Sequence, residues 1–285
     1  MDVTYLSFWT FVLAAALLLP FLLLERRKKR ATHLDGKGIG EFALLGIVGA
    51  IPPSVLMAWG IAHSTASNGA ILSLTIPVLM VIMAAVMLGE KMTWIRYVSI
   101  GMAIVGTIMV SRIRAEAGFF GGGVLAGNGV IFFAGAGAAF YNTYSKKLLA
   151  RFSELELLVY SDVVAALACA VLSLLGVGRP FYQVGGYPLS AWGAVLILGG
   201  FSWGLAMALW MWVLKRLEVS QVSASVYLLS FFGVLLSALT LHEHLTLPQI
   251  AGGVFVLLGT FLTSDYEARR EARKKLAASP DQPVP

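Results

Sequence analysis

Polar and aromatic side chains recur inside long apolar stretches of this 285-residue chain, at spacings that give them shared helical faces. Asn68 and Thr75 lie on one such face, and Trp203 and Trp210 lie on another, because residues three, four and seven apart point the same way on a helix. Amides, hydroxyls and aromatic rings bind a small, partly apolar, neutral or zwitterionic solute by hydrogen bonding and stacking. The candidates are Trp59, Asn68, Thr75, Pro77, Tyr141, Asn142, Trp203, Trp210, Gln221 and Ser225.

Each candidate also has a plainer interpretation, which stays open at this point. Trp and Tyr often mark the bilayer interface, and polar residues in apolar helices often serve helix packing. Pro77 should bend its helix, and that bend could border a solute path or only ease packing. Asn68 and Gln221, both amides, lie 153 positions apart.

Asp162 is the one acid well inside an apolar stretch, about nine residues from the start of 153–176. A charge at the bilayer centre costs roughly 2.5–3.5 kcal/mol on insertion scales, so this side chain should face the bundle interior. It could couple transport of a solute to protons. A neutral or hydrogen-bonded structural role is the alternative.

No metal, cofactor or catalytic site is expected. His242-Glu243-His244 holds ligand-type side chains, but its spacing does not place two histidines on one helical face. Cys169 is the single cysteine, so a disulfide framework and a thiol cluster are excluded. No nucleophile with a partner base and no nucleotide-binding glycine loop is present, which argues against an enzyme.

The elements that must position these residues are membrane-spanning helices. The chain is 58% hydrophobic and only 13% charged, with a mean hydropathy of +0.82, whereas soluble domains carry about 25% charged residues. Nucleic acid is excluded as a partner because the basic residues cluster between apolar stretches. Nine spans of suitable length are predicted, at 3–24, 39–62, 67–88, 94–112, 125–147, 153–176, 190–214, 220–241 and 247–264.

Basic residues predict the orientation. With the amino terminus outside, 18 Lys and Arg fall on the cytoplasmic side and 3 on the outer side. Short cytoplasmic loops carry this excess in membrane proteins. We therefore expect a multi-pass protein of the inner (cytoplasmic) membrane, with its amino terminus outside and its carboxyl terminus in the cytoplasm.

An internal repeat with a spacing of 153 residues runs from Gly60/Val213 to Ser111/Ser264. Leu88/Leu241, Glu90/Glu243 and Thr93/Thr246 are identical pairs in the same register. The turn at Glu90 falls on the cytoplasmic side of the predicted membrane, and the equivalent turn at Glu243 falls on the outer side. This indicates inverted topology, a usual feature of transporters. The predicted division is 1–112 (first repeat, four helices), 113–124 (outer loop), 125–264 (second repeat, five helices) and 265–285 (basic cytoplasmic tail).

Five stretches have the order and spacing of a known family: Ala62–Ala70, Leu72–Val78, Leu88–Thr93, Ala139–Leu148 and Trp212–Leu217. Through these stretches the chain resembles the ten-span drug/metabolite transporter superfamily, in particular its EamA-type exporters. This resemblance implies two inverted five-helix units around a central cavity, alternating access, and export of small metabolites or amino acids. The chain departs from the family pattern in three ways: the family's first helix is absent, Ser230 replaces a proline, and His242 replaces a glycine.

The expected function is secondary active export of a small metabolite or amino acid across the cytoplasmic membrane. The alternatives are a membrane-embedded enzyme and a non-transporting membrane scaffold. Expected partners are the small-molecule substrate and the lipid bilayer. The runs Gly135–Ala139 and Gly252-Gly253 permit close helix approach and could also form a homodimer face.

Overall fold

The structure is a computed structural model that describes residues 1–28, 34–64, 66–110, 124–183, 185–228 and 250–259, with 232, 247, 261–262, 266 and 269. Among these residues the regular elements are all helices, joined by short connections and without a β-strand, which confirms the expected all-α polytopic membrane fold. Four helical rods are long and apolar enough to cross a bilayer. They are Val3–Arg27, Gly36–Ala62, Glu154–Leu174 and Leu189–Arg216.

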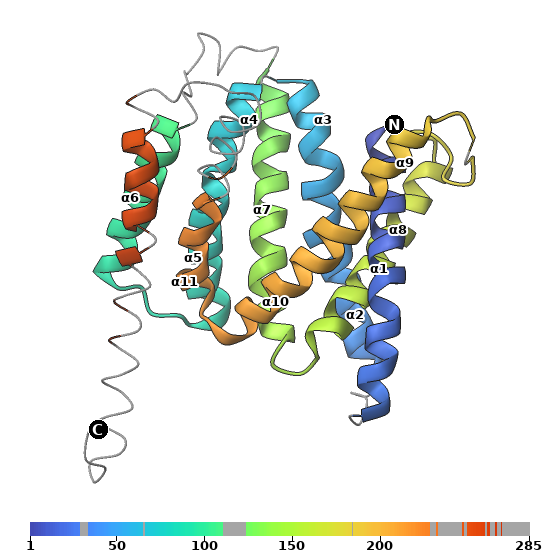
Figure 1. Cartoon of the computed structure of the whole chain (residues 1–285), viewed down its shortest axis with the longest axis horizontal. Helices are drawn as coiled ribbons and strands as arrows, with labels where there is room; N and C mark the ends of the chain where they lie inside the picture. Colours follow the sequence, from blue (N-terminus) through green and yellow to red (C-terminus); the bar gives the residue numbers. More distant parts are fainter. Residues whose placement is uncertain are drawn as a thin grey trace. The chain divides into compact units, whose positions relative to one another are not determined.

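The chain divides into two compact units. Unit 1 comprises Met1–Leu88 with Ala115–Val219, and unit 2 comprises Gly89–Arg114 with Ser220–Pro285. Figure 1 shows the helices of unit 1. They are α1 (Val3–Lys28), α2 (Gly36–Leu44), η1 (Leu45–Ala50), η2 (Pro52–Leu56), α3 (Met57–Ala62), α4 (Ala66–Ser73), α5 (Thr75–Leu88), α7 (Leu125–Leu148), α8 (Glu154–Leu174), α9 (Leu189–Leu196), η3 (Ile197–Ala206) and α10 (Met207–Arg216).

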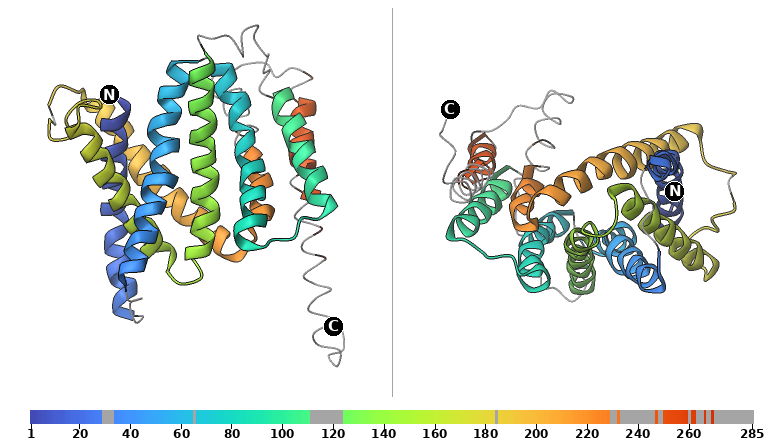
Figure 2. Two further views of the ribbon diagram at one scale, coloured as in Figure 1. Left: turned by 180° about the vertical axis from the view of Figure 1, so that it is seen from behind. Right: turned by 90° about the horizontal axis from the view of Figure 1, so that it is seen from below.

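Helices α1 and α8 pack side by side and run in opposite directions (Figure 2). At one end, Arg26 near the end of α1 pairs with Glu156 in the first turn of α8 at 3.3 Å. At the other end, the Arg179 N–H, beyond the end of α8, donates to Asp2 Oδ2 at 2.9 Å. A shift of 153 residues places α1 on α8. The structural repeat therefore begins earlier in each copy than the identical residue pairs indicated.

The rods Gly36–Ala62 and Leu189–Arg216 are continuous helices with a widened, π-helical middle section. Pro52-Pro53 lie inside the first rod, and the helix continues through them. The two prolines remove two backbone N–H donors, and the helix widens here instead of ending. The Met57 N–H then donates to Pro52 O, five residues back. Ser54 Oγ donates to Ala50 O at 2.8 Å, which satisfies one carbonyl near the prolines.

The π-helical sections occupy equivalent positions in the two repeats. Shifting η1 by 153 residues gives 198–203, which lies inside η3. Each section meets its neighbour at a glycine. A Cβ on Gly46 would lie 2.5 Å from Val164 Cγ1 on α8, and a Cβ on Gly199 would lie 2.8 Å from Thr10 O on α1. Only glycine allows the helices to approach this closely.

Helices α4 and α5 form one bent span. The bend lies at Leu74, between Ser73 and Thr75, and Pro77 is buried in the first turn of α5. Its missing N–H leaves Ser73 O without a helical donor, so the predicted distortion at this proline is observed. Thr75 Oγ1 donates to Leu72 O at 2.6 Å, which satisfies another carbonyl at the bend.

Helix α7 lies among η1, η2, α3, α4 and α5 within unit 1. Its small residues explain this central place. A Cβ on Gly137 would lie 2.8 Å from Pro52 Cβ, and one on Gly127 would lie 2.3 Å from His63 O. The run of small residues therefore brings the backbone of α7 onto the rod Gly36–Ala62 at two levels.

In unit 2, α6 (Trp94–Val110) packs against the helical residues 250–259. A Cβ on Gly106 would lie 2.6 Å from Gly252 O, and one on Gly259 would lie 2.8 Å from Ser99 O. Two further helical segments, α11 (Val219–Ser223) and η4 (Ala224–Tyr227), lie at the start of the carboxyl-terminal part. Ser230, His242–His244 and the basic tail beyond Arg269 lie outside the described residues, so the expectations for them stay predictions.

Candidate functional site

Two neighbouring residues of α7 carry polar groups toward different helices of unit 1. Asn142 Oδ1 accepts a hydrogen bond from the Trp210 Nε1–H of α10 at 2.6 Å. The Asn142 amide NH₂ donates to Ala138 O, one turn back in α7, at 2.8 Å. The amide is therefore oriented by its own helix and presents its carbonyl oxygen to the indole. Two residues that were predicted separately are thus in direct contact.

Tyr141, the preceding residue, joins α7 to α8. Its phenol oxygen shares a hydrogen bond with Ser161 Oγ at 3.2 Å, and both side chains are buried. Ser161 Oγ also lies 3.1 Å from Leu158 O, to which it donates. A Cβ on Gly49 would lie 3.0 Å from Tyr141 Cβ, so η1 presses directly on this tyrosine. The tyrosine is held from two sides.

Asp162 follows Ser161 and is fully buried. Within the described part of the chain, neither carboxylate oxygen has a hydrogen-bond partner. The burial of Asp162 within unit 1 agrees with the expectation that it faces the bundle interior. Of the two structural alternatives, a neutral side chain or a hydrogen-bonded one, the second finds no hydrogen bond among the described residues. Asp162 directly follows Ser161, which shares a hydrogen bond with Tyr141.

Asn68 belongs to a second polar cluster, on α4, and only 2% of it is exposed. Its Nδ2 donates to Ser64 Oγ at 3.3 Å, and Ser64 Oγ donates in turn to Asn128 Oδ1 of α7. Nearby, the Trp59 ring of α3 stacks on His63 with ring centroids 3.9 Å apart. This cluster joins three helices at the end of unit 1 where α3 ends and α7 begins.

The remaining candidates are more scattered. Trp203 packs edge-on against Phe11 of α1, with ring centroids 4.9 Å apart. Gln221 and Ser225 belong to unit 2. Ser225 Oγ donates to Val222 O at 2.6 Å, a bond within its own helical turn. The structure therefore brings together Asn142 with Trp210, and Tyr141 with Asp162.

Sequence reasoning missed several polar partners. Ser64, Asn128 and Ser161 complete the two clusters, and their position inside apolar spans was the signal that could have found them. Glu90, noted in the sequence only as one of the identical repeat pairs, has a structural partner as well. Its carboxylate accepts from the Ser220 N–H at 3.0 Å, at the start of α11 in the same unit.

Arg96 supports the same contact in unit 2 and is only 1% exposed. Its guanidinium donates to Ser220 Oγ at 2.7 Å and to Lys91 O at 3.0 Å. A carboxylate at a helix start also offsets the partial positive charge of the helix N-terminus. The Glu90 turn is therefore tied to Ser220 by a half-buried carboxylate and a buried guanidinium.

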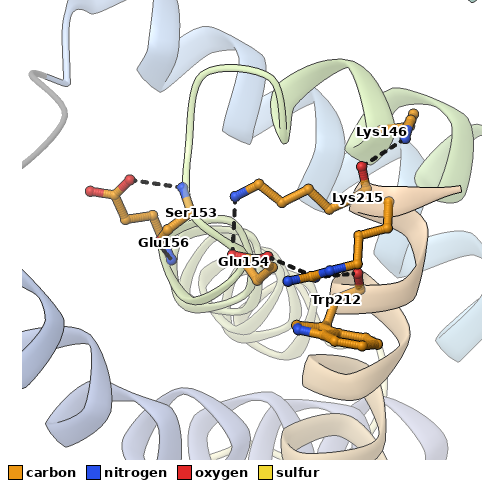
Figure 3. Close-up of polar contacts among 7 residues, drawn as sticks. Lys146, Ser153, Glu154, Glu156, Trp212 and Lys215 are labelled. Carbon is orange, nitrogen blue, oxygen red and sulfur yellow. Dashed lines mark hydrogen bonds and ion pairs between the residues drawn. The ribbon is translucent and has the colours of Figure 1, made fainter. Parts of the chain in front are cut away.

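Five basic side chains of unit 1 gather at one end, called here the basic end: Arg26, Lys146, Arg151, Lys215 and Arg216. Lys215 pairs with Glu154 at 3.1 Å, so the end of α10 meets the start of α8 (Figure 3). Lys146 Nζ donates to Leu214 O at 2.8 Å, near the end of α10. Its cation thus lies at the negative end of that helix.

An apolar groove of about 690 Å³ lies elsewhere in unit 1, between α1 and the rod Leu189–Arg216. None of the candidate residues lines it. Its walls have hardly any polar surface, so it offers no group to bind a polar solute. Its main lining residues are Leu17, Phe21, Leu155, Ile197, Phe201 and Leu205.

Among the described residues, no three His, Cys, Asp or Glu side chains are placed to hold a metal ion. The clusters of unit 1 instead offer amides, hydroxyls, a phenol and an indole in buried, apolar surroundings. Such groups recognise a small solute through a few oriented hydrogen bonds. The arrangement fits binding without bond cleavage.

Comparison with known proteins agrees with this chemistry. The chain is 27% identical over 254 residues to a probable terminal-alkyne amino-acid exporter of Streptantibioticus cattleyicolor, covering 89% of this chain and 80% of that protein. It is 24% identical to the uncharacterized transporter YyaM of Bacillus subtilis, covering 90% and 82%. A crystal structure with 17% identity superposes with a TM-score of 0.76 over 95% of this chain and 90% of the other, which supports the fold.

The model of the EamA-like transporter family matches residues 1–112 and 125–265. These two segments hold nearly all the helices described above. The resemblance noted in the sequence is thereby confirmed, and the relatives reported above are named as transporters. The chain belongs to the EamA-like transporter family.

Proposed function

We propose that this protein is a secondary active transporter that exports a small metabolite, and that an amino acid is the first substrate class to test. The observation that carries the proposal is the pair of rods Gly36–Ala62 and Leu189–Arg216. They occupy equivalent positions in the two repeats, and both have a π-helical middle section. The first packs against α8 through η1, and the second packs against α1 through η3. Inverted pairs of irregular helices are typical of alternating-access transporters.

The polar groups of unit 1 support a substrate path along α7. Asn142 and Trp210 combine an amide with an indole at the contact between α7 and α10. An aromatic face and an amide suit an amino acid with an apolar side chain, because one group packs against the side chain while the other bonds a polar end. A relative named as an amino-acid exporter agrees with this substrate class.

The basic end supports the proposed orientation in the cytoplasmic membrane. Arg26, Lys146, Lys215 and Arg216 lie where α1, α7 and α10 end and α8 begins. Lys and Arg are retained on the cytoplasmic side of bacterial membranes. We assign this end to the cytoplasm, which leaves the amino terminus outside.

Counterflow in proteoliposomes tests the function. Vesicles holding the purified protein are loaded with unlabelled L-propargylglycine, the simplest terminal-alkyne amino acid, or with one of the common L-amino acids. Uptake of trace label of the same compound is then measured. We expect saturable counterflow for at least one compound, lowered at least tenfold by Asn142→Ala. Absence of counterflow for every compound would contradict the proposal, provided that a cooperative thermal transition shows the protein to be folded.

A further inference from the structure

Asp162 is an acidic residue in buried surroundings that provide no hydrogen-bond donor to its carboxyl group among the described residues. The carboxyl group is fully buried within α8, a span of mean hydropathy 2.2. Neither oxygen has a hydrogen-bond partner among the described residues. Burying an unpaired carboxylate costs far more than burying a neutral carboxylic acid. The side chain is therefore stable in this arrangement only when it carries a proton.

The ion pairs and hydrogen bonds formed by charged side chains on the elements packed against α8 lie near the ends of that helix. On α1, Arg26 pairs with Glu156, and Asp2 accepts from the Arg179 N–H. On α10, Lys215 and Arg216 both pair with Glu154. Eight residues of helix, about 12 Å, separate Glu154 from Asp162.

The remaining packed elements give the same result. On α2, Glu41 pairs with Arg151 at 2.8 Å, while Lys37 lies in the first turn, at the same end. The segment η1 contains only apolar residues and glycine. On α7, Tyr141 bonds Ser161, the residue next to Asp162, and a phenol is ordinarily uncharged near neutral pH.

The segment that lies beside Asp162 has irregular helical geometry. A Cβ on Gly46 would lie 3.1 Å from Ser161 O, so η1 lies against α8 directly beside Asp162. This segment is π-helical, a geometry that is rare and frequent at functional sites. A shift of η1 away from α8 would expose the carboxyl group to water, where it ionises.

We propose that Asp162 binds and releases the proton that drives export, an inference that rests on the proposed transport function. The carboxylate takes up one proton from the outer side, carries it while buried as the neutral acid, and releases it to the cytoplasm as the substrate moves outward. A proton fits better than a sodium ion. Sodium needs several oxygen ligands, and the nearby Ser161 and Tyr141 oxygens already bond each other.

The first test reads the proton itself and does not need a substrate. Infrared difference spectra compare wild type with Asp162→Asn at neutral pH in lipid. We expect the carbonyl stretching band of a protonated carboxylic acid in wild type and its loss in the variant. Because Asn has nearly the shape of the neutral acid, the thermal transition should be unchanged. If wild type shows carboxylate bands that the variant lacks, and no acid carbonyl band, Asp162 is ionised and the proposal is overturned.

The second test measures coupling. Vesicles with an interior one pH unit more acidic, and with the membrane potential clamped, should accumulate the compound that shows counterflow about tenfold, because one pH unit corresponds to about 1.4 kcal/mol. Asp162→Asn should remove this accumulation. Glu156→Gln is the control, since it changes another acid of α8 to an amide and keeps the capping box at its start.

The outcomes separate the coupling from the function. Accumulation that ignores the pH gradient, that follows a sodium gradient instead, or that persists in Asp162→Asn would overturn the proposal while leaving transport intact. Loss of accumulation in Glu156→Gln as well would also overturn it, because the effect would then not belong to Asp162. Failure of counterflow in wild type would refute the transport function and the coupling with it, whereas the infrared comparison would still report the buried proton.

Discussion

Gly46 and Gly199 are equivalent residues of the two repeats, and each lets a π-helical section touch a neighbouring helix. Gly46 brings η1 onto α8, and Gly199 brings η3 onto α1. Since α1 and α8 are themselves repeat partners that run antiparallel, the two contacts are related by the same inversion. The middle of each rod is therefore closely packed and irregular at once, which suits a segment that must shift between two packed positions.

Replacing Gly46 by alanine tests this close contact. The added Cβ would lie 2.5 Å from Val164 Cγ1, so η1 and α8 must separate. Overpacking of this kind typically costs 1–3 kcal/mol. We expect Gly46→Ala to lower the thermal transition in detergent and to slow counterflow.

Gly40 in the same rod provides the control. A Cβ there meets no atom within 4 Å. Gly40→Ala should therefore stabilise the helix slightly, by up to about 1 kcal/mol, because alanine has the higher helix propensity. Equal stability of Gly46→Ala and Gly40→Ala would contradict the packing described for η1.

The bond between Asn142 and Trp210 predicts energetic coupling. Trp210→Phe removes the indole N–H and leaves the Asn142 oxygen without its donor. A buried hydrogen bond contributes about 0.5–1.5 kcal/mol, and the double variant with Asn142→Ala should cost less than the sum of the singles by that amount. Unfolding in a denaturant series measures the cycle.

Trp212→Phe is the matched control for this pair, because Trp212 lies on the same helix and is 52% exposed. Its ring lies under the Arg216 guanidinium, 3.8 Å away, instead of bonding α7. We expect no coupling between Trp212→Phe and Asn142→Ala. Strict additivity for Trp210 and Asn142 would instead mean that their bond does not stabilise the fold.

Lys146 should stabilise the junction of α7 and α10. Its ammonium donates to Leu214 O, Lys215 O and Leu217 O, at 2.8, 3.0 and 2.8 Å. Two of these bonds are exposed, so water replaces part of the loss and Lys146→Met should cost only about 1 kcal/mol. Lys147→Met, next in sequence, should cost less in the same thermal assay. The reverse order would refute this role.

Pro77 should affect transport more than stability. Pro77→Ala restores an N–H that can bond Ser73 O, so α4 and α5 can join into one straight helix. We expect counterflow to fall at least severalfold, with an unchanged or raised thermal transition.

Pro20 is the control for this substitution, since it lies inside α1 at an exposed position. Pro20→Ala should leave counterflow as in wild type. Equal rates for Pro77→Ala and wild type would show that the bend at Leu74 serves packing alone.

Periodicity and composition predicted most of the fold, because apolar length and turn residues are local properties. The spans around α1, α7 and α8 lie close to their predicted limits, and Pro77 distorts its helix as expected. Pro52-Pro53 could not be predicted in the same way. Whether a proline breaks or widens a helix depends on the neighbours that hold both halves in line, here α7 at Gly137.

The site was less predictable than the fold. Helical faces placed Asn142 and Trp210 inside the bundle, but only three-dimensional packing shows that they meet. Asp162 was found because a charge in an apolar span is unusual, whereas Ser161 and Asn128 were missed because hydroxyls and amides are common there. Long-range partners such as Glu90 and Ser220 have no local signal at all.

Access to Asn142 from both sides of the membrane tests the central claim most directly. In a Cys169→Ala background, which removes the single, buried native thiol, Asn142→Cys is exposed to a membrane-impermeant thiol reagent in vesicles of either orientation. Phe133→Cys, on the opposite, 71% exposed face of α7, is the control that should stay unlabelled in lipid. Alternating access predicts labelling of Asn142→Cys from both sides, slowed by the transported amino acid. Labelling from one side only, or from neither, would contradict it.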